Sequence, residues 1–155
     1  MWIELNELEQ RIARHLAKKR HETDRQLGIS NRRIGPQSDD DTDLEGIGAE
    51  LAYCKAVNVY PDLATDYKSL PTEDAITRDG YRVDVKSTTY ERGHLLATLG
   101  KAGNPADIYV LVVGRFPRYR IAGFMHVDEL LQEERIKDLS HGPGYAARQD
   151  ELEPM

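Results

Sequence analysis

Asp84 and Lys86 are the two residues whose types and spacing most directly suggest chemistry, because they stand two positions apart in an alternating stretch. Residues two apart in a β-strand lie on the same face, so this carboxylate and this ammonium lie side by side while Val83 and Val85 point into the core. A carboxylate and an ammonium on a rigid strand, with further carboxylates nearby, can hold a divalent cation beside a phosphate. The spacing therefore indicates metal-dependent cleavage of a phosphodiester.

The strand that carries these residues is the second strand of a β-hairpin, and Asp79-Gly80 is the signal for its turn. Two acids in the first strand are candidates for the same face. A strict two-residue turn puts Glu73 on the face of Asp84, whereas a three-residue loop with Gly80 in a left-handed conformation brings Asp74 beside Asp84. The residues alone leave both registers open.

A third acid, Glu50, lies on a helix that we expect to begin near positions 41–43 and to run to about position 58. At 100° per residue Glu50 falls at the edge of the apolar arc, while Glu45 falls on the opposite side. An inward carboxylate is costly unless it is paired or bound to a metal, so Glu50 is either a ligand or the partner of an arginine. Gly46 and Gly48 predict a close approach of another part of the chain. The arc consists of Leu44, Ile47, Leu51 and Cys54.

The remaining pattern predicts an α/β sandwich around a mixed central sheet. Helical spacing of leucine and isoleucine over residues 3–27 predicts a first helix with Gly28 as its C-cap. Residues 29–42 have no periodicity and are expected to form a linker. We expect strands at 94–99, 107–114 and 119–127, a helix from 128 to about 136, and a loop-like ending.

Composition limits the function classes. The chain has 155 residues, a formal net charge of −6 and a single cysteine, Cys54, so it can form no internal disulfide. No window approaches the ~18 apolar residues that span a bilayer, and the acidic N-terminus lacks the pattern of a secretion signal. These features predict a cytoplasmic protein without membrane segments. The net charge argues against coating of nucleic acid by bulk attraction, although a basic run extends from Arg11 to Arg33.

A helix with an inward acid, an acid on one strand and Asp-x-Lys on the next resembles the PD-(D/E)XK nuclease superfamily over residues 43–127. The matching positions are Glu50, Asp74 and Asp84-Val85-Lys86, and the surrounding sequence is similar to that of small phage-encoded members. The resemblance implies a restriction-endonuclease-like core, a mixed central β-sheet flanked by helices, with an N-terminal helical extension. The expected division is a basic helix and linker at 1–40 and a nuclease-like domain at 41–155. The resemblance also favours Asp74 over Glu73.

The function implied by this resemblance is a Mg²⁺-dependent DNA endonuclease or exonuclease that leaves a 5′-phosphate and a 3′-hydroxyl. Asp74, Asp84 and the backbone carbonyl of Val85 would hold Mg²⁺, for which Mn²⁺ would substitute. Glu50 would bind this ion through water or help to hold a second one. Lys86 would stabilise the charge on the phosphate.

The expected partner is DNA, and cleavage of two strands would need two sites and so favours a homodimer. The residues expected to contact phosphates are Lys18, Lys19, Arg20, Arg32, Arg33 and Ser87. For a phage-encoded protein the compartment would be the host cytoplasm. Two other function classes are a non-catalytic nucleic-acid-binding module of the same fold and a structural or assembly protein whose hairpin charges are solvated surface.

Overall fold

The computed structural model describes residues 1–28, 39–65, 73–103, 105–139 and 142–155, and it is a mixed α/β protein. Its helices are α1 (Glu7–Leu27), α2 (Asp39–Val57) and α3 (Val127–Leu130). Its strands are β1 (Trp2–Glu4), β2 (Ala75–Ile76), β3 (Arg82–Thr88), β4 (Leu95–Thr98), β5 (Ile108–Arg115), β6 (Arg118–His126), β7 (Ile136–Asp138) and β8 (Pro143–Ala147). Short 3₁₀ helices at Leu99–Gly103, Glu133–Arg135 and Gln149–Glu151 complete the described chain.

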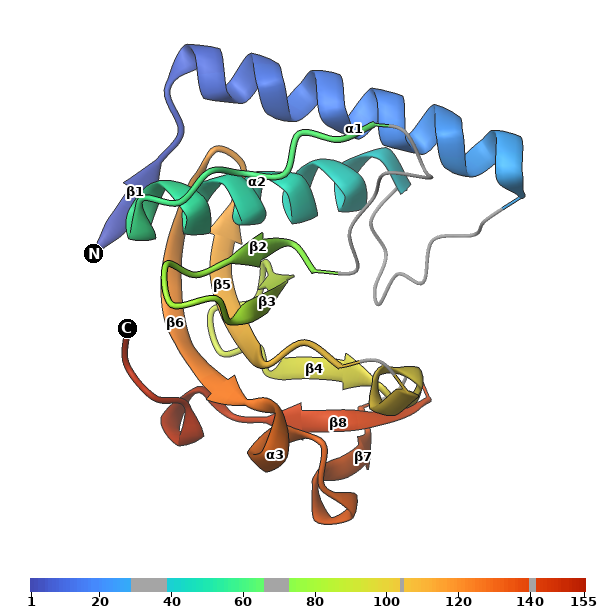
Figure 1. Cartoon of the computed structure of the whole chain (residues 1–155), viewed down its shortest axis with the longest axis vertical. Helices are drawn as coiled ribbons and strands as arrows, with labels where there is room; N and C mark the ends of the chain where they lie inside the picture. Colours follow the sequence, from blue (N-terminus) through green and yellow to red (C-terminus); the bar gives the residue numbers. More distant parts are fainter. Residues whose placement is uncertain (29–38, 66–72, 104, 140–141) are drawn as a thin grey trace.

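The central sheet is mixed and strongly curled (Figure 1). Its strand order is β1-β6-β5-β3-β2, with β3 and β5 parallel and the other neighbours antiparallel. The helices α1 and α2 cover one face, and a second sheet of order β4-β8-β7 lies at the other end of the curl. The strands expected at 94–99, 107–114 and 119–127 are confirmed as β4, β5 and β6, within two residues at each end.

The curled sheet is buried on both faces, because alternate side chains of its central strands enter two different hydrophobic clusters. Val83 and Val85 pack with α1 and α2, as the alternation predicts. On the opposite face Tyr109 and Leu111 of β5 pack with the second sheet. Asp84 points to this second face and is 3% exposed. No other charged residue in the described ranges is buried.

The N-terminal segment belongs to the same core as the rest of the protein. Trp2–Glu4, which the pattern assigns mostly to a helix, instead forms β1 and pairs with β6. The helix α1 begins after Asn6, whose side chain accepts a hydrogen bond from the Glu9 N–H at 2.9 Å in a capping box. It ends at Gly28 in the left-handed conformation, as expected. Buried residues of α1 pack in one cluster with α2, so this helix is a layer of the domain.

The C-terminal part differs most from the sequence expectation. The helix expected over 128–136 is confined to α3, and a 3₁₀ turn and β7 follow it. The ending predicted as a loop contains β8, in which Tyr145, Ala146 and Ala147 are buried. Glycine, proline and alanine give no local signal for a strand, and β8 exists because β4 and β7 pair with it. Within the described ranges, no helix combines the length and the apolar character that crossing a bilayer demands.

Candidate functional site

The β2–β3 hairpin adopts the register that brings Asp74 opposite Asp84. The Thr77 N–H donates to the Tyr81 carbonyl at 2.9 Å across a three-residue loop, and Gly80 in this loop has a φ of 89°. Ala75 therefore pairs with Val83, and the preceding residue stands opposite Asp84. The bulged-loop prediction is confirmed, and the register that would have put Glu73 on this face is wrong.

Asp84 is held between two lysines. The Nζ of Lys86 lies 2.6 Å from Oδ1, and the Nζ of Lys101 lies 2.6 Å from Oδ2. The contact of Lys86 is a close ion pair whose direction does not make a hydrogen bond. Burial lowers the pKa of Lys101, but the hydrogen bond and charge of Asp84 outweigh this effect, so the pKa lies above its usual value.

Asp74 lies immediately before β2, between the other acids. Its Oδ2 accepts a hydrogen bond from the Val85 N–H at 2.7 Å. Burial, followed by the negative charge of Asp84, raises the pKa of Asp74 to about 6, against the opposing effects of that hydrogen bond and of the lysines. A cation placed here would remove the repulsion between the carboxylates.

Glu50 faces the protein interior from α2, as its helical phase predicts. Its Oε2 lies 3.4 Å from the Nη1 of Arg20, and its side chain is 20% exposed. Burial raises the pKa of Glu50 to about 8, and the charge of Asp74 adds to this effect while Arg20 opposes it. The arginine partner that the sequence left open is therefore present, and Glu50 also lies within electrostatic reach of Asp74.

Arg20 has a different position from the one expected for a phosphate contact. Its Nη2 donates to the carbonyl of Asp62 at 3.1 Å and its Nε to the carbonyl of Ala64 at 3.2 Å, so α1 is tied to this segment as well as to Glu50. Lys18 and Lys19 on the same helix are exposed.

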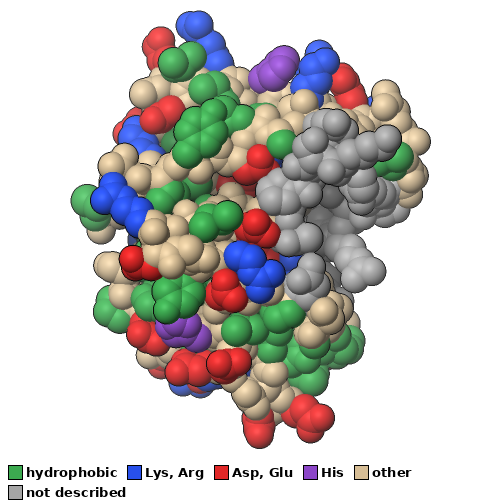
Figure 2. All heavy atoms as spheres, viewed as in Figure 1, with side chains coloured by type: hydrophobic (Ala, Val, Ile, Leu, Met, Phe, Trp, Pro, Cys, Tyr) green, Lys and Arg blue, Asp and Glu red, His purple; other side chains and the backbone are tan. Residues whose placement is uncertain are grey.

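The other residues expected to contact nucleic acid are placed as follows. Ser87 is exposed on β3. Arg32 and Arg33 lie outside the described residues. Figure 2 shows acidic and basic side chains close together on the face that carries the site.

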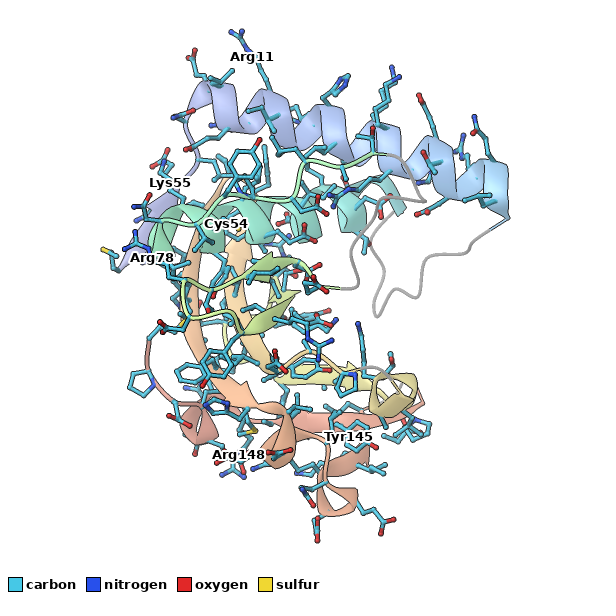
Figure 3. The ribbon with its side chains drawn as sticks, viewed as in Figure 1. Arg11, Cys54, Lys55, Arg78, Tyr145 and Arg148 are labelled. Atoms are coloured by element: carbon cyan, nitrogen blue, oxygen red, sulfur yellow. The ribbon has the colours of Figure 1, made fainter. Side chains whose placement is uncertain are left out.

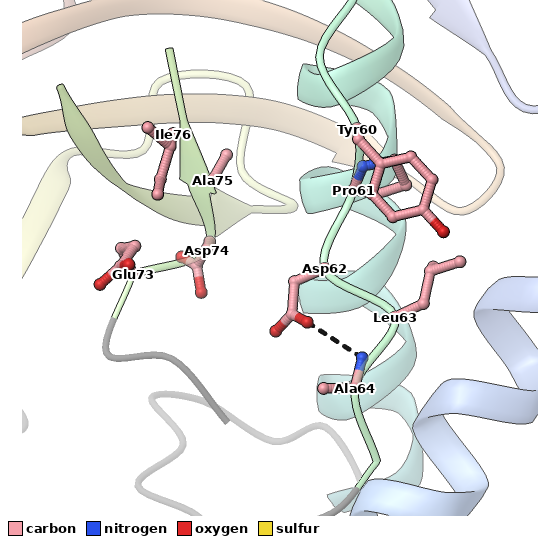
Figure 4. Close-up of a pocket in the computed structure, with 9 residues that line it drawn as sticks. All are labelled: Tyr60, Pro61, Asp62, Leu63, Ala64, Glu73, Asp74, Ala75 and Ile76. Atoms are coloured by element: carbon pink, nitrogen blue, oxygen red, sulfur yellow. Dashed lines mark hydrogen bonds between the residues drawn. The ribbon is translucent and has the colours of Figure 1, made fainter. Parts of the chain in front are cut away.

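A cavity of about 540 Å³ opens between the segment after α2 and the start of β2 (Figure 4). Asp62 and Asp74 line facing walls of this cavity, and Glu73 lines it too. The remaining lining is largely apolar and includes Tyr60 and Ile76. Asp62 accepts a hydrogen bond from the Ala64 N–H at 2.9 Å and is a further acid of the site that sequence reasoning missed.

The donor atoms at this site are carboxylate oxygens, which Mg²⁺ prefers. In the ranges that the structure describes, no three or more His, Cys, Asp or Glu side chains are grouped so as to hold a metal ion. The ammonium groups of Lys86 and Lys101 lie against the oxygens of Asp84 instead. The residue types therefore fit a hard cation, and binding one would require at least one of these lysines to leave Asp84.

The chain belongs to a protein family of unknown function, DUF5843, whose model matches residues 4–120. The match extends from β1 into β6 and so includes the acids and both lysines of the candidate site. No curated protein matches the chain.

Proposed function

We propose that this protein is a Mg²⁺-dependent nuclease with a restriction-endonuclease-like core that hydrolyses DNA to 5′-phosphate and 3′-hydroxyl ends. The observation that carries the proposal is the position of Asp74 opposite Asp84, with the Lys86 ammonium 2.6 Å from Asp84. Glu50 of α2 supports the proposal, because burial and then the charge of Asp74 raise its pKa, so this helix acid lies within electrostatic reach of the hairpin acids.

The metal would be held by Asp74, Asp84 and the carbonyl of Val85. The Val85 N–H is directed at Asp74, and in a strand the carbonyl of a residue points to the same side as its N–H. When bound, the ion would supply an activated water and neutralise charge on the scissile phosphate. Lys86 would stabilise negative charge on that phosphate, and Glu50 would orient water at the ion.

The test is cleavage of linear, nicked, branched and single-stranded DNA by the purified protein in Mg²⁺ or Mn²⁺. We expect cleavage that a chelator stops and that Asp84→Asn lowers at least ~100-fold, the scale on which a stabilising group acts in a transition state. Asp150→Asn is the control, because Asp150 is an exposed partner of Arg148 away from the hairpin. Intact DNA in every substrate class with both metals would overturn the proposal.

A second readout does not require cleavage. Saturation with Mg²⁺ at about 100 times its dissociation constant stabilises a protein by about 2.7 kcal/mol. We expect a rise in melting temperature with Mg²⁺ that Asp74→Asn and Asp84→Asn abolish and Asp150→Asn retains.

The two lysines that contact Asp84 favour one other candidate, a DNA-binding module without catalysis. Lys86 and Lys101 together place two positive charges beside this carboxylate, and these would attract a phosphate. Salt-sensitive DNA binding that survives Asp84→Asn, with no cleavage by any form, would favour this alternative.

A further inference from the structure

The carboxylate of Asp84 contacts two lysines, and both also act electrostatically on the neighbouring Asp74. One well-placed cation compensates the charge of Asp84, yet both Lys86 and Lys101 approach this carboxylate to 2.6 Å, and within the described ranges Asp74 has no ion pair of its own with either lysine. The side chains of these lysines are 30% and 32% exposed, so both reach the protein surface from a carboxylate that is itself buried.

The two lysines differ in how firmly the fold holds them. Lys86 lies on β3, which is paired on both sides within the central sheet. Lys101 lies in the 3₁₀ helix Leu99–Gly103, which has no buried residue. Lys101 is therefore the ammonium that can leave Asp84 at lower cost.

A second observation at the same place is the hydroxyl of Tyr109. This side chain is fully buried; the Ala106 N–H is directed at its hydroxyl oxygen, but the hydroxyl proton has no acceptor among the described residues. Tyr109 is the register partner of Asp84 on the neighbouring parallel strand and interacts electrostatically with both Asp84 and Lys101. A buried hydroxyl donor without an acceptor costs about 1–3 kcal/mol, and an arrangement in which Tyr109 donates to Asp84 would remove that cost.

We propose that Lys101 contacts a phosphate of the bound nucleic acid, and that the Tyr109 hydroxyl then donates to Asp84 in its place. The inference rests on the proposed function in taking a phosphodiester as the ligand. Lysine binds phosphate as a point charge, and a phosphodiester beside Asp84 offers Lys101 a negative partner that is closer to solvent. No bond forms or breaks in this exchange of partners, and the proton stays on the Lys101 ammonium.

The experiment measures binding of a short DNA duplex in Ca²⁺, with Lys101→Gln compared against Lys55→Gln. Lys55 is the control because it is a lysine whose ammonium also lies 2.8 Å from a carboxylate oxygen, that of Glu9, and it is exposed near the C-terminal end of α2 (Figure 3). We expect Lys101→Gln to weaken binding about tenfold and to reduce the slope of log K against log salt by about 1. Lys101→Arg should restore the slope, and Lys55→Gln should leave it unchanged.

A slope for Lys101→Gln equal to that of the unmodified protein would overturn the inference. If Lys101→Gln cut DNA at the wild-type rate and had an unchanged slope, the phosphate contact would be overturned and the proposed nuclease would stand. A reduced slope in a protein that cuts no DNA would support the phosphate contact and overturn the nuclease. Tyr109→Phe should lower cleavage about tenfold without changing the slope, and unchanged cleavage would overturn the role of the hydroxyl.

Discussion

Two glutamates on α2, Glu45 and Glu50, lie in contrasting surroundings. The carboxylate of Glu45 accepts hydrogen bonds from the Phe116 N–H at 2.9 and 3.1 Å and from the Tyr119 hydroxyl at 3.1 Å. Among the described residues, the carboxylate of Glu50 has one side-chain partner, Arg20, at 3.4 Å. The first glutamate joins α2 to the β5–β6 connection. The second faces other acids, Asp74 and Asp62.

The difference shows how a structural carboxylate can be distinguished from one available for a ligand. Burial raises the pKa of both groups, but neutral donors oppose the effect at Glu45. At Glu50 the charge of Asp74 adds to burial, and the pKa reaches about 8. A carboxylate whose oxygens are occupied by donors gains little from a cation, whereas one placed among like charges gains much.

The largest effect on this comparison is expected from Glu45→Ala. The change leaves the Phe116 N–H without its acceptor and the buried Tyr119 hydroxyl with only the Glu45 backbone carbonyl at 3.5 Å, at a cost of about 3 kcal/mol in the free energy of unfolding. Urea denaturation measures this loss. Glu45→Gln retains one acceptor oxygen and should lose less. A loss below about 1 kcal/mol for the alanine variant would show that Glu45 is not a structural anchor.

The second test concerns the two glycines of α2 that lie between these glutamates. A Cβ on Gly48 would lie 2.2 Å from the hydroxyl oxygen of Tyr119 and 2.9 Å from Cδ2 of Phe116, whereas a Cβ on Gly46 would meet no atom within 4 Å. We expect Gly48→Ala to destabilise the protein by about 2 kcal/mol through overpacking at the anchor of Glu45. Gly46→Ala should stabilise the protein by about 0.5–1 kcal/mol, because alanine favours a helix.

Equal effects of these two alanines in thermal or urea denaturation would contradict the close packing of α2 on the β5–β6 connection. The sequence predicts a close approach at both glycines, and the structure provides it at Gly48 alone. The periodicity of the helix could not separate the two positions, because the neighbour of Gly48 comes from residues 116–119, far along the chain.

The parts of the site that the sequence predicted are those set by local geometry. The helical phase turned Glu50 inward, and the Asp79-Gly80 turn with its bulge brought Asp74 opposite Asp84. Each of these depends on residues within one helix or one hairpin. The inward position of Glu45 was missed because its donors belong to the β5–β6 connection.

The parts that could not be predicted depend on long-range packing. Lys101 stands between the strands expected at 94–99 and 107–114, where no element is predicted, and only the parallel pairing of β3 with β5 brings that stretch to Asp84. Asp62 and Arg20 meet because α1 packs beside the segment after α2, with no spacing rule between them. Similarly, β8 is a strand only in the presence of β4.

The third test uses pH and the variant Glu50→Gln. The pKa of Glu50 is about 8 in the folded protein, above its ordinary value of 4.5, so between these pH values the folded state binds more protons than the unfolded state. The free energy of unfolding contributed by this group therefore falls as pH rises through this window. Glutamine does not titrate, so the variant should be more stable than the wild type by about 2 kcal/mol at pH 9, with the difference vanishing below pH 4.5.

Urea denaturation of both proteins from pH 4 to pH 9 measures the difference, in which groups common to both cancel. The gain is smaller than the full pKa shift would give, because Arg20 loses an anionic partner and keeps Asp62. A difference that stays constant with pH would mean that Glu50 is not held among repelling charges. The same variant should show a smaller rise in melting temperature with Mg²⁺ than the wild type. The Glu50 carboxylate destabilises the fold when no cation is bound, and it is the group that a cation would stabilise.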